Sequence, residues 1–126
     1  MQVSDKQKAP RYERDGIVSH LLVSEWTTKA LFLTTSLVEM SPGGTQQPHV
    51  HEAEQCYFIL EGEGLMTVGK ERQLVSSGDC IFIPSNETHG LENTGRSGLR
   101  YFSAAAPSFG GVEALKKLWP LDAEGK

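Results

Sequence analysis

The chain is divided into many short runs of β-branched and aromatic residues, each soon ended by glycine, proline, serine or asparagine. Runs of this length and composition are typical of β-strands rather than of long helices. Strands are therefore predicted at 16–26, 29–40, 55–62, 64–75, 78–84 and 98–107. Within 64–75, Gly69 and Lys70 are predicted to form a hairpin turn.

Several short strands in a chain of 126 residues indicate one domain, 1–126, in which one sheet face is buried against another. A sandwich or a closed barrel satisfies this need, and a jelly-roll-like barrel has an interior that accepts a small ligand. Helical spacing occurs at 110–121, where Leu115, Leu118 and Trp119 share one face before Pro120. We predict an all-β fold with a short C-terminal helix at about 110–119.

The charge of the chain argues against two classes of partner. Twelve basic and sixteen acidic residues give a net charge of -4, and the longest basic cluster is Lys116-Lys117. We therefore expect no nucleic-acid partner. The apolar runs are shorter than the roughly 20 residues that span a bilayer, and the first residues are too charged for a signal peptide. These observations predict no membrane association and a cytoplasmic location.

Three of the four histidines occur in two polar segments that flank apolar runs. His49 and His51 are one residue apart, and alternate residues of a strand point to the same face, so both imidazoles can project together. His89 can be a third metal ligand if the second segment lies beside the first. For His20, inside a predicted strand, we expect an ordinary hydrogen-bonded role.

Other catalytic arrangements have little support in the sequence. The chain has no G-x-S-x-G turn, no phosphate-binding glycine loop and no C-x-x-C pair. Cys56 and Cys80 lie among tyrosine, phenylalanine and isoleucine, and we interpret them as buried free thiols rather than as nucleophiles.

The two polar segments together resemble the two motifs of the cupin superfamily. The first segment, 43–62, follows G-x5-H-x-H-x3-Q-x6-G, where the family has G-x5-H-x-H-x3,4-E-x6-G. The second, 78–93, follows G-x5-P-x-N-x2-H-x3-N, where the family has glycine in place of Asn86. The resemblance covers about residues 36–102 and implies a jelly-roll β-barrel, also called a double-stranded β-helix, that binds a divalent metal.

The resemblance implies that His49, His51 and His89 bind the metal and that Gln55 occupies the fourth protein position. Asn86 is tolerable in place of glycine because asparagine also adopts left-handed turn conformations. Gln55 replaces the family's glutamate, which leaves a bound divalent ion with its full charge and makes an anionic substrate the natural completion of the shell.

The sequence allows two roles for several residues around the metal. Gln55 binds the metal directly or through a water molecule. Glu52 or Glu54 could supply a carboxylate only through a bulge, because both point away from the histidine face of an extended strand. Strand parity places Gln55, Tyr57 and Ile59 on one face, so Tyr57 lines the cavity or, as the alternative, donates a proton as a catalytic residue. Asn93 is expected to hold a return turn through its side chain.

We expect a small metal-dependent enzyme that acts on an oxygen-rich or anionic small molecule. Three nitrogens and a neutral oxygen suit Zn, Ni, Fe, Mn or Cu, and the missing carboxylate shifts the preference away from Mn. Isomerase, cyclase or lyase chemistry is favoured over dioxygenase chemistry. One alternative is a binding or sensing module without catalysis, and another is a metal-free sugar-nucleotide epimerase of related fold. The resemblance also implies a homodimer, with 16–26 as the candidate interface.

Overall fold

The computed structural model describes residues 1–107. This part of the chain forms strands joined by turns and loops, and its strands are β1 (Arg11–Arg14), β2 (Ile17–Val23), β3 (Thr34–Met40), β4 (Thr45–His49), β5 (Glu54–Glu61), β6 (Glu63–Val68), β7 (Glu71–Ser76), β8 (Cys80–Ile83), β9 (His89–Glu92) and β10 (Leu99–Ala106). The predicted helix at 110–119 lies outside the described residues.

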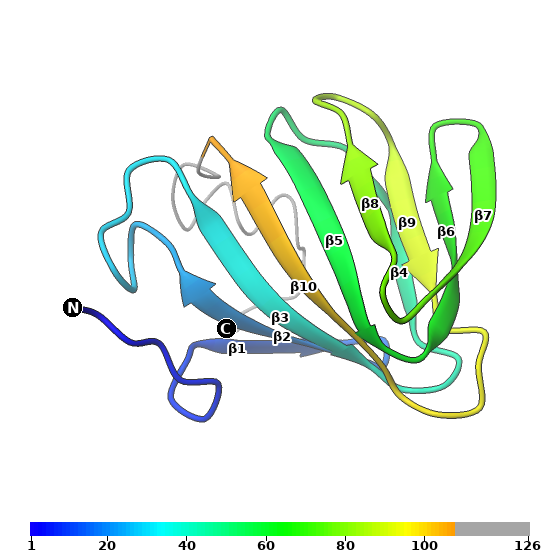
Figure 1. Cartoon of the computed structure of the whole chain (residues 1–126), viewed down its shortest axis with the longest axis horizontal. Coiled ribbons are helices and arrows are strands. Elements are labelled where there is room, and N and C mark those ends of the chain that lie inside the picture. Colours follow the sequence, from blue (N-terminus) through cyan, green and yellow to red (C-terminus); the bar gives the residue numbers. More distant parts are fainter. Residues whose placement is uncertain (108–126) are drawn as a thin grey trace.

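The strands form two antiparallel sheets, as a jelly roll requires. The larger sheet has six strands in the order β1-β2-β3-β10-β5-β8, and the smaller has four in the order β4-β9-β6-β7. In Figure 1 the larger sheet spreads from the left to the centre and the smaller sheet lies to the right. β4 and β9, which carry the two predicted metal-binding segments, are neighbours in the smaller sheet. The all-β prediction is confirmed.

The core lies between the inner faces of the two sheets. Alternation along β5 buries Gln55, Tyr57 and Ile59 and leaves Phe58 and Leu60 exposed, as the predicted parity requires. The buried apolar cluster draws on both sheets and consists of Ile17, Val38, Met40, Tyr57, Ile59, Met66, Val75, Ile83, Leu91, Leu99 and Tyr101. The two sheets that carry the polar site are therefore held together by apolar packing between their inner faces.

The hairpins follow local turn chemistry. The predicted turn at Gly69-Lys70 is confirmed, because Val68 pairs with Glu71 across it. β1 was not predicted, since RYER lacks apolar alternation, but Asp15 and Gly16 both have positive φ values, 54° and 78°, and join Arg14 to Ile17. An Asp-Gly pair is a strong hairpin signal and could have revealed this strand.

The predicted strand boundaries at 16–26 and 29–40 are too wide. β2 ends at Val23 because the hydroxyl of Ser24 accepts hydrogen bonds from the backbone N–H groups of Trp26 and Thr27 and forms a turn. Residues 29–33 are not in a strand, although 30–33 are apolar. These residues have no strand to pair with, because Thr34, the first residue of β3, is already opposite Ala105 near the end of β10.

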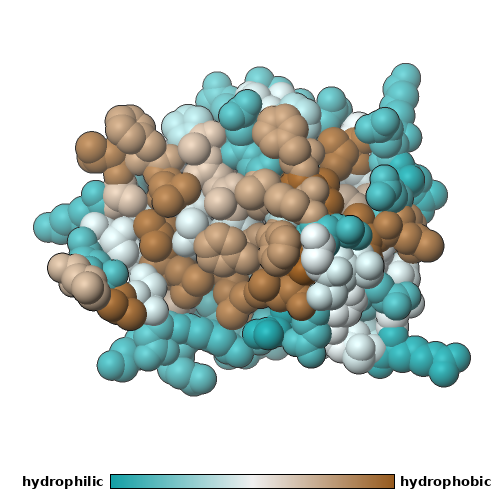
Figure 2. All heavy atoms as spheres, in the orientation of Figure 1, coloured by the Kyte–Doolittle hydropathy of each residue, from teal (hydrophilic) through white to brown (hydrophobic). Residues whose placement is uncertain are grey.

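The two cysteines are free, but the prediction that both are buried is wrong. Cys80 is exposed and Cys56 is partly exposed. Ile83 is buried in β8 and Phe82, one residue before it, is exposed, so alternation turns Cys80 and Phe82 outward. Figure 2 shows apolar side chains gathered across the face that carries the central strands of the larger sheet. Its exposed members include Phe58, Leu60 and Phe82.

Residues 1–107 contain no helical segment that could span a bilayer.

Candidate metal centre

Strand pairing places His49 beside His89. The two residues are directly opposite each other on β4 and β9. His51 lies just after β4, and its carbonyl accepts a hydrogen bond of 2.8 Å from the backbone N–H of Asn86. This bond ties the turn before β9 to the segment that carries His51. Asn86 has a φ of 63°, so asparagine here adopts the left-handed conformation that the family usually assigns to glycine.

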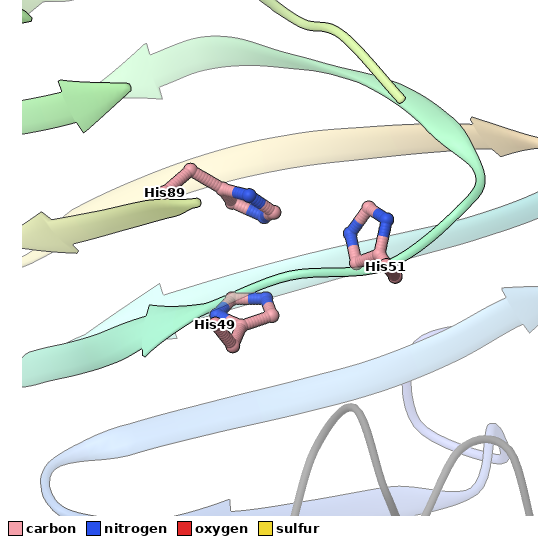
Figure 3. Close-up of side chains that lie close together, drawn as sticks. All are labelled: His49, His51 and His89. Carbon is pink, nitrogen blue, oxygen red and sulfur yellow. The ribbon is translucent and has the colours of Figure 1, made fainter. Parts of the chain in front are cut away.

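The three imidazoles converge in space. One ligand nitrogen from each of His49, His51 and His89 lies within 4.8 Å of the other two. Figure 3 shows the three rings directed toward a common point, from the end of β4, the following loop and the start of β9. Two nitrogens bound to one ion at about 2.1 Å lie at most about 4.2 Å apart, so small side-chain rotations bring this cluster to bonding distance.

Backbone carbonyls orient all three rings. The Nδ1 atoms of His49, His51 and His89 lie 3.0, 2.9 and 3.0 Å from the carbonyl oxygens of Gln47, Ala53 and Glu87, respectively. A carbonyl only accepts, so each Nδ1 carries the proton. In a neutral ring the lone pair is then on Nε2. The same outer hydrogen bond orients the histidine ligands of known metal sites.

The nitrogen atoms of the three histidines suit a bound metal cation. His89 is fully buried, and its Nε2 atom has no hydrogen-bond partner among residues 1–107. A buried nitrogen of this kind is costly unless a ligand engages it. Burial lowers the pKa of His89 to about 4, and burial also lowers the pKa of His49. Both rings are therefore neutral near pH 7, as metal ligation requires.

Gln55 extends the cluster from the opposite sheet. Its side chain is buried on the inner face of β5, and its Oε1 atom lies 2.8 Å from Nε2 of His51. Its Nε2 atom donates to Oγ of Ser103 over 2.6 Å. The amide oxygen thus points to the histidines, which agrees with a ligand role and leaves direct coordination a prediction.

The structure does not form the alternative ligand set with a neighbouring carboxylate. Glu52 and Glu54 are exposed, whereas His51, Ala53 and Gln55 between and beside them are buried. Among the described residues the metal-competent cluster contains histidines alone. Alternation thus persists through the segment, without the bulge that a carboxylate ligand would need.

Tyr57 lies next to the histidines in a neutral polar network. Its ring centroid is 6.2 Å from that of His89 and 4.2 Å from that of Tyr101, on which it stacks. Its hydroxyl donates to Oε1 of Gln46 over 3.1 Å, and the amide of Gln46 donates to the hydroxyl of Tyr101 over 3.0 Å. Burial raises the pKa of Tyr57 to about 12. Tyr57 therefore remains protonated, and its role as cavity wall or proton donor stays a prediction.

Three further buried polar residues take part in side-chain hydrogen bonds, Asn93 in the fold and Gln46 and Ser103 in the site. Asn93 was expected to hold a turn, and its amide donates to the carbonyls of Met40 and Ser97 at 3.0 Å each. Gln46 and Ser103 were not predicted. Alternation along 98–107 places Ser103 on the same side of the strand as Tyr101. The contact of Ser103 with Gln55 depends on the pairing of β10 with β5, which the sequence does not show.

In the metal-free protein we expect the free energy of unfolding to fall as the pH is lowered from about 6.5 to 4. In this range an unfolded chain protonates its histidines, while the lowered pKa values of His49 and His89 delay protonation in the folded state. For His89 the loss amounts to about 2–3 kcal/mol by pH 4. Urea unfolding of chelator-treated protein at several pH values measures it, and a His89→Gln variant should show a smaller slope. A pH-independent stability would contradict the assignment.

Comparison with known proteins agrees with this geometry. Residues 36–104 match the cupin domain family. The chain belongs to the cupin family. An uncharacterised protein of Methanocaldococcus jannaschii is 32% identical over 106 residues, which cover 83% of this cupin and 84% of that protein. The oxalate-binding protein of Thermotoga maritima is 32% identical over 87 residues, 68% of this chain and 71% of that protein.

Solved structures show the same fold. The crystal structure of a predicted oxalate decarboxylase from Thermotoga maritima superposes with a TM-score of 0.75 at 21% identity, over 84% of this cupin and 99% of that chain. At this identity the likeness concerns the jelly-roll barrel alone. The three-histidine cluster of the present cupin is capable of holding a metal ion.

Proposed function

We propose that this cupin is a metal-dependent enzyme that acts on a small, anionic, oxygen-rich molecule. His49, His51 and His89 would hold the ion, with the amide oxygen of Gln55 as the fourth protein ligand. When bound, a divalent ion supplies a Lewis acid that polarises carbonyl or carboxylate oxygens. Zn, Ni, Fe, Mn and Cu all suit these donors, and nitrogen-preferring ions suit them best.

One observation supports an anionic substrate above all. The buried polar side chains of residues 1–107 are hydroxyls, amides and histidines, with no aspartate, glutamate, lysine or arginine among them. The proposed ligands are therefore all neutral, and the charge of a divalent ion would remain uncompensated by the chain. A carboxylate or enolate is the ligand class that best balances such a centre.

The second candidate is a binding protein without catalysis. The oxalate-binding protein of Thermotoga maritima, 32% identical over 87 residues, favours it. A small dicarboxylate would compensate the charge of the ion equally well, so the geometry alone supports both functions. Turnover separates them.

The experiment begins with the metal content of protein purified without added metal, measured by elemental analysis. Metal-loaded and metal-free samples are then incubated with sugar acids, diketones and small dicarboxylates, including oxalate, and followed by NMR and calorimetry. Metal-dependent turnover supports the enzyme, whereas metal-dependent binding without turnover supports the binding protein. Protein that takes up no stoichiometric metal would contradict both and would favour a metal-free epimerase.

Our proposal also includes a homodimer. β2 lies between β1 and β3 and is largely buried, so the exposed large apolar side chain of residues 16–26 is Trp26, beyond the end of β2. Phe58 and Phe82 are instead 41% and 58% exposed on the outer face of the larger sheet. Ion pairs within the chain, Lys6 with Glu39 and Arg100 with Glu61, neutralise charges on strands of this sheet. These pairs reduce the charge that a second copy would meet on this face.

Analytical ultracentrifugation is expected to show a dimer that a Phe82→Glu substitution converts to monomer. The buried charge would oppose apolar packing at such an interface. Leu74→Glu is a suitable control, because Leu74 is 70% exposed but lies on β7 of the smaller sheet. A monomeric parent protein, or a dimer unaffected by Phe82→Glu, would contradict this interface.

A further inference from the structure

Ser103 ends a buried chain of hydrogen-bonding groups that begins at the histidine cluster. The carbonyl of Ala53 lies 2.9 Å from Nδ1 of His51, Nε2 of His51 lies 2.8 Å from Oε1 of Gln55, and Nε2 of Gln55 lies 2.6 Å from Oγ of Ser103. His51, Gln55 and Ser103 are 7%, 8% and 5% exposed. The hydrogen bonds among these groups, rather than contacts with solvent, therefore set the orientation of their side chains.

The directions of these hydrogen bonds show which atoms of His51 and Gln55 face each other. The Ala53 carbonyl takes the Nδ1 proton, so a neutral His51 ring presents a lone pair at Nε2. The amide oxygen of Gln55 presents lone pairs to the same place. Two acceptors 2.8 Å apart repel each other unless a proton or a metal cation lies between them. Two ligand atoms bound to one tetrahedral ion at about 2.1 Å are about 3.4 Å apart, so a small side-chain shift suits both atoms to such an ion.

A glutamine side chain can also be reversed, and the reversed form would not bind a cation. Exchange of the amide oxygen and nitrogen would place the NH₂ group toward His51, where it would donate to Nε2 and repel a metal ion. A carboxylate has no such ambiguity, because its two oxygens are equivalent. Replacement of the family's glutamate by Gln55 therefore creates a need for a group that selects one amide orientation.

We propose that Ser103 is the positioning residue that holds the Gln55 amide with its oxygen toward the metal; this rests on the proposed metal site. Ser103 is on β10, whose register places it opposite Tyr57, two residues from Gln55 on β5. Its Oγ atom accepts the hydrogen bond from the amide NH₂. Coordination of the amide oxygen polarises the NH₂ group, so this bond is stronger in the metal-bound protein than in the metal-free protein.

The same hydroxyl has the opposite effect on a carboxylate. In a Gln55→Glu variant, Ser103 would donate to the carboxylate. That bond is strongest while the carboxylate carries its full charge, before a metal ion shares it. Loss of the hydroxyl should therefore weaken metal binding when residue 55 is glutamine and should not weaken it when residue 55 is glutamate.

The test measures Zn²⁺ affinity by competition with a chromophoric chelator in a double-mutant cycle. Ser103→Ala is expected to weaken Zn²⁺ binding about tenfold in the parent protein, the lower end of the effect of groups that orient metal ligands. In the Gln55→Glu background the same change is expected to leave the affinity unchanged or raise it. Ser103→Thr, which keeps a hydroxyl, should stay within about threefold of the parent, and circular dichroism checks the fold of each variant.

The outcomes separate the two proposals. Equal weakening by Ser103→Ala in both backgrounds would indicate a packing role and would overturn the positioning role. An unchanged affinity in the parent background, with Zn²⁺ still bound, would overturn it as well and would leave the metal site intact. Failure of the parent protein to bind Zn²⁺ would overturn the metal site and, with it, the role of Ser103.

Discussion

His89→Ala is expected to abolish stoichiometric metal binding while the domain stays folded. His89 is fully buried, and its Nε2 atom has no hydrogen-bond partner within residues 1–107. Loss of residues that merely orient metal ligands costs about 10–100-fold in affinity, so loss of a ligand should exceed about 100-fold. Elemental analysis and chelator competition measure the effect, and circular dichroism reports the fold. His51→Ala should behave in the same way.

His20→Ala is the matched control for this substitution. His20 is also buried, but its Nε2 atom lies 2.8 Å from a carboxylate oxygen of Glu39, which agrees with the ordinary role expected for it. The control should keep its metal, although loss of the pair with Glu39 can lower stability. Retention of full metal occupancy by His89→Ala would show that the assignment of the three-histidine centre is wrong.

Gln55→Glu is expected to tighten metal binding by about 10- to 100-fold, which corresponds to about 1.4–2.8 kcal/mol. The substitution adds a negative charge to a site whose described ligands are neutral. The Coulombic gain is large, but the desolvation of a buried carboxylate offsets much of it, so the net effect is moderate. Chelator competition near pH 7 gives the affinity, and the reduced charge should at the same time weaken the binding of an anionic ligand.

Glu54→Gln provides the control on the same strand. Glu54 is exposed and points away from the cluster, so removal of its charge should change metal affinity little. Weaker metal binding by Gln55→Glu would place residue 55 outside the coordination shell and would favour contact through water. The two substitutions together separate a ligand effect from a general change in surface charge.

The strand predictions agree with the structure where apolar and polar residues alternate regularly along the sequence. The inward set Gln55, Tyr57 and Ile59 and the hairpin at Gly69 are confirmed. The predictions are wrong where the pairing of strands, rather than the local composition, decides where a strand ends or which side chains are buried. Residues 30–33 are as apolar as the strand that follows, yet the neighbouring strands end before reaching them. Cys80 is exposed because β8 is an edge strand with one buried face, so an apolar neighbourhood in the sequence did not imply burial.

The sequence alone indicated the strand-rich fold, the cupin motifs and four of the residues that meet at the site. Alternation along the strands marks their buried faces, and the resemblance to the two motifs marks the ligand positions. Tertiary structure decided the rest. The pairing of His49 with His89 and the contact of Gln55 with Ser103 join strands that are distant in the chain. Such contacts depend on register between strands, which no local pattern specifies. The chemistry of the centre therefore follows from how the two sheets face each other as much as from the histidines themselves.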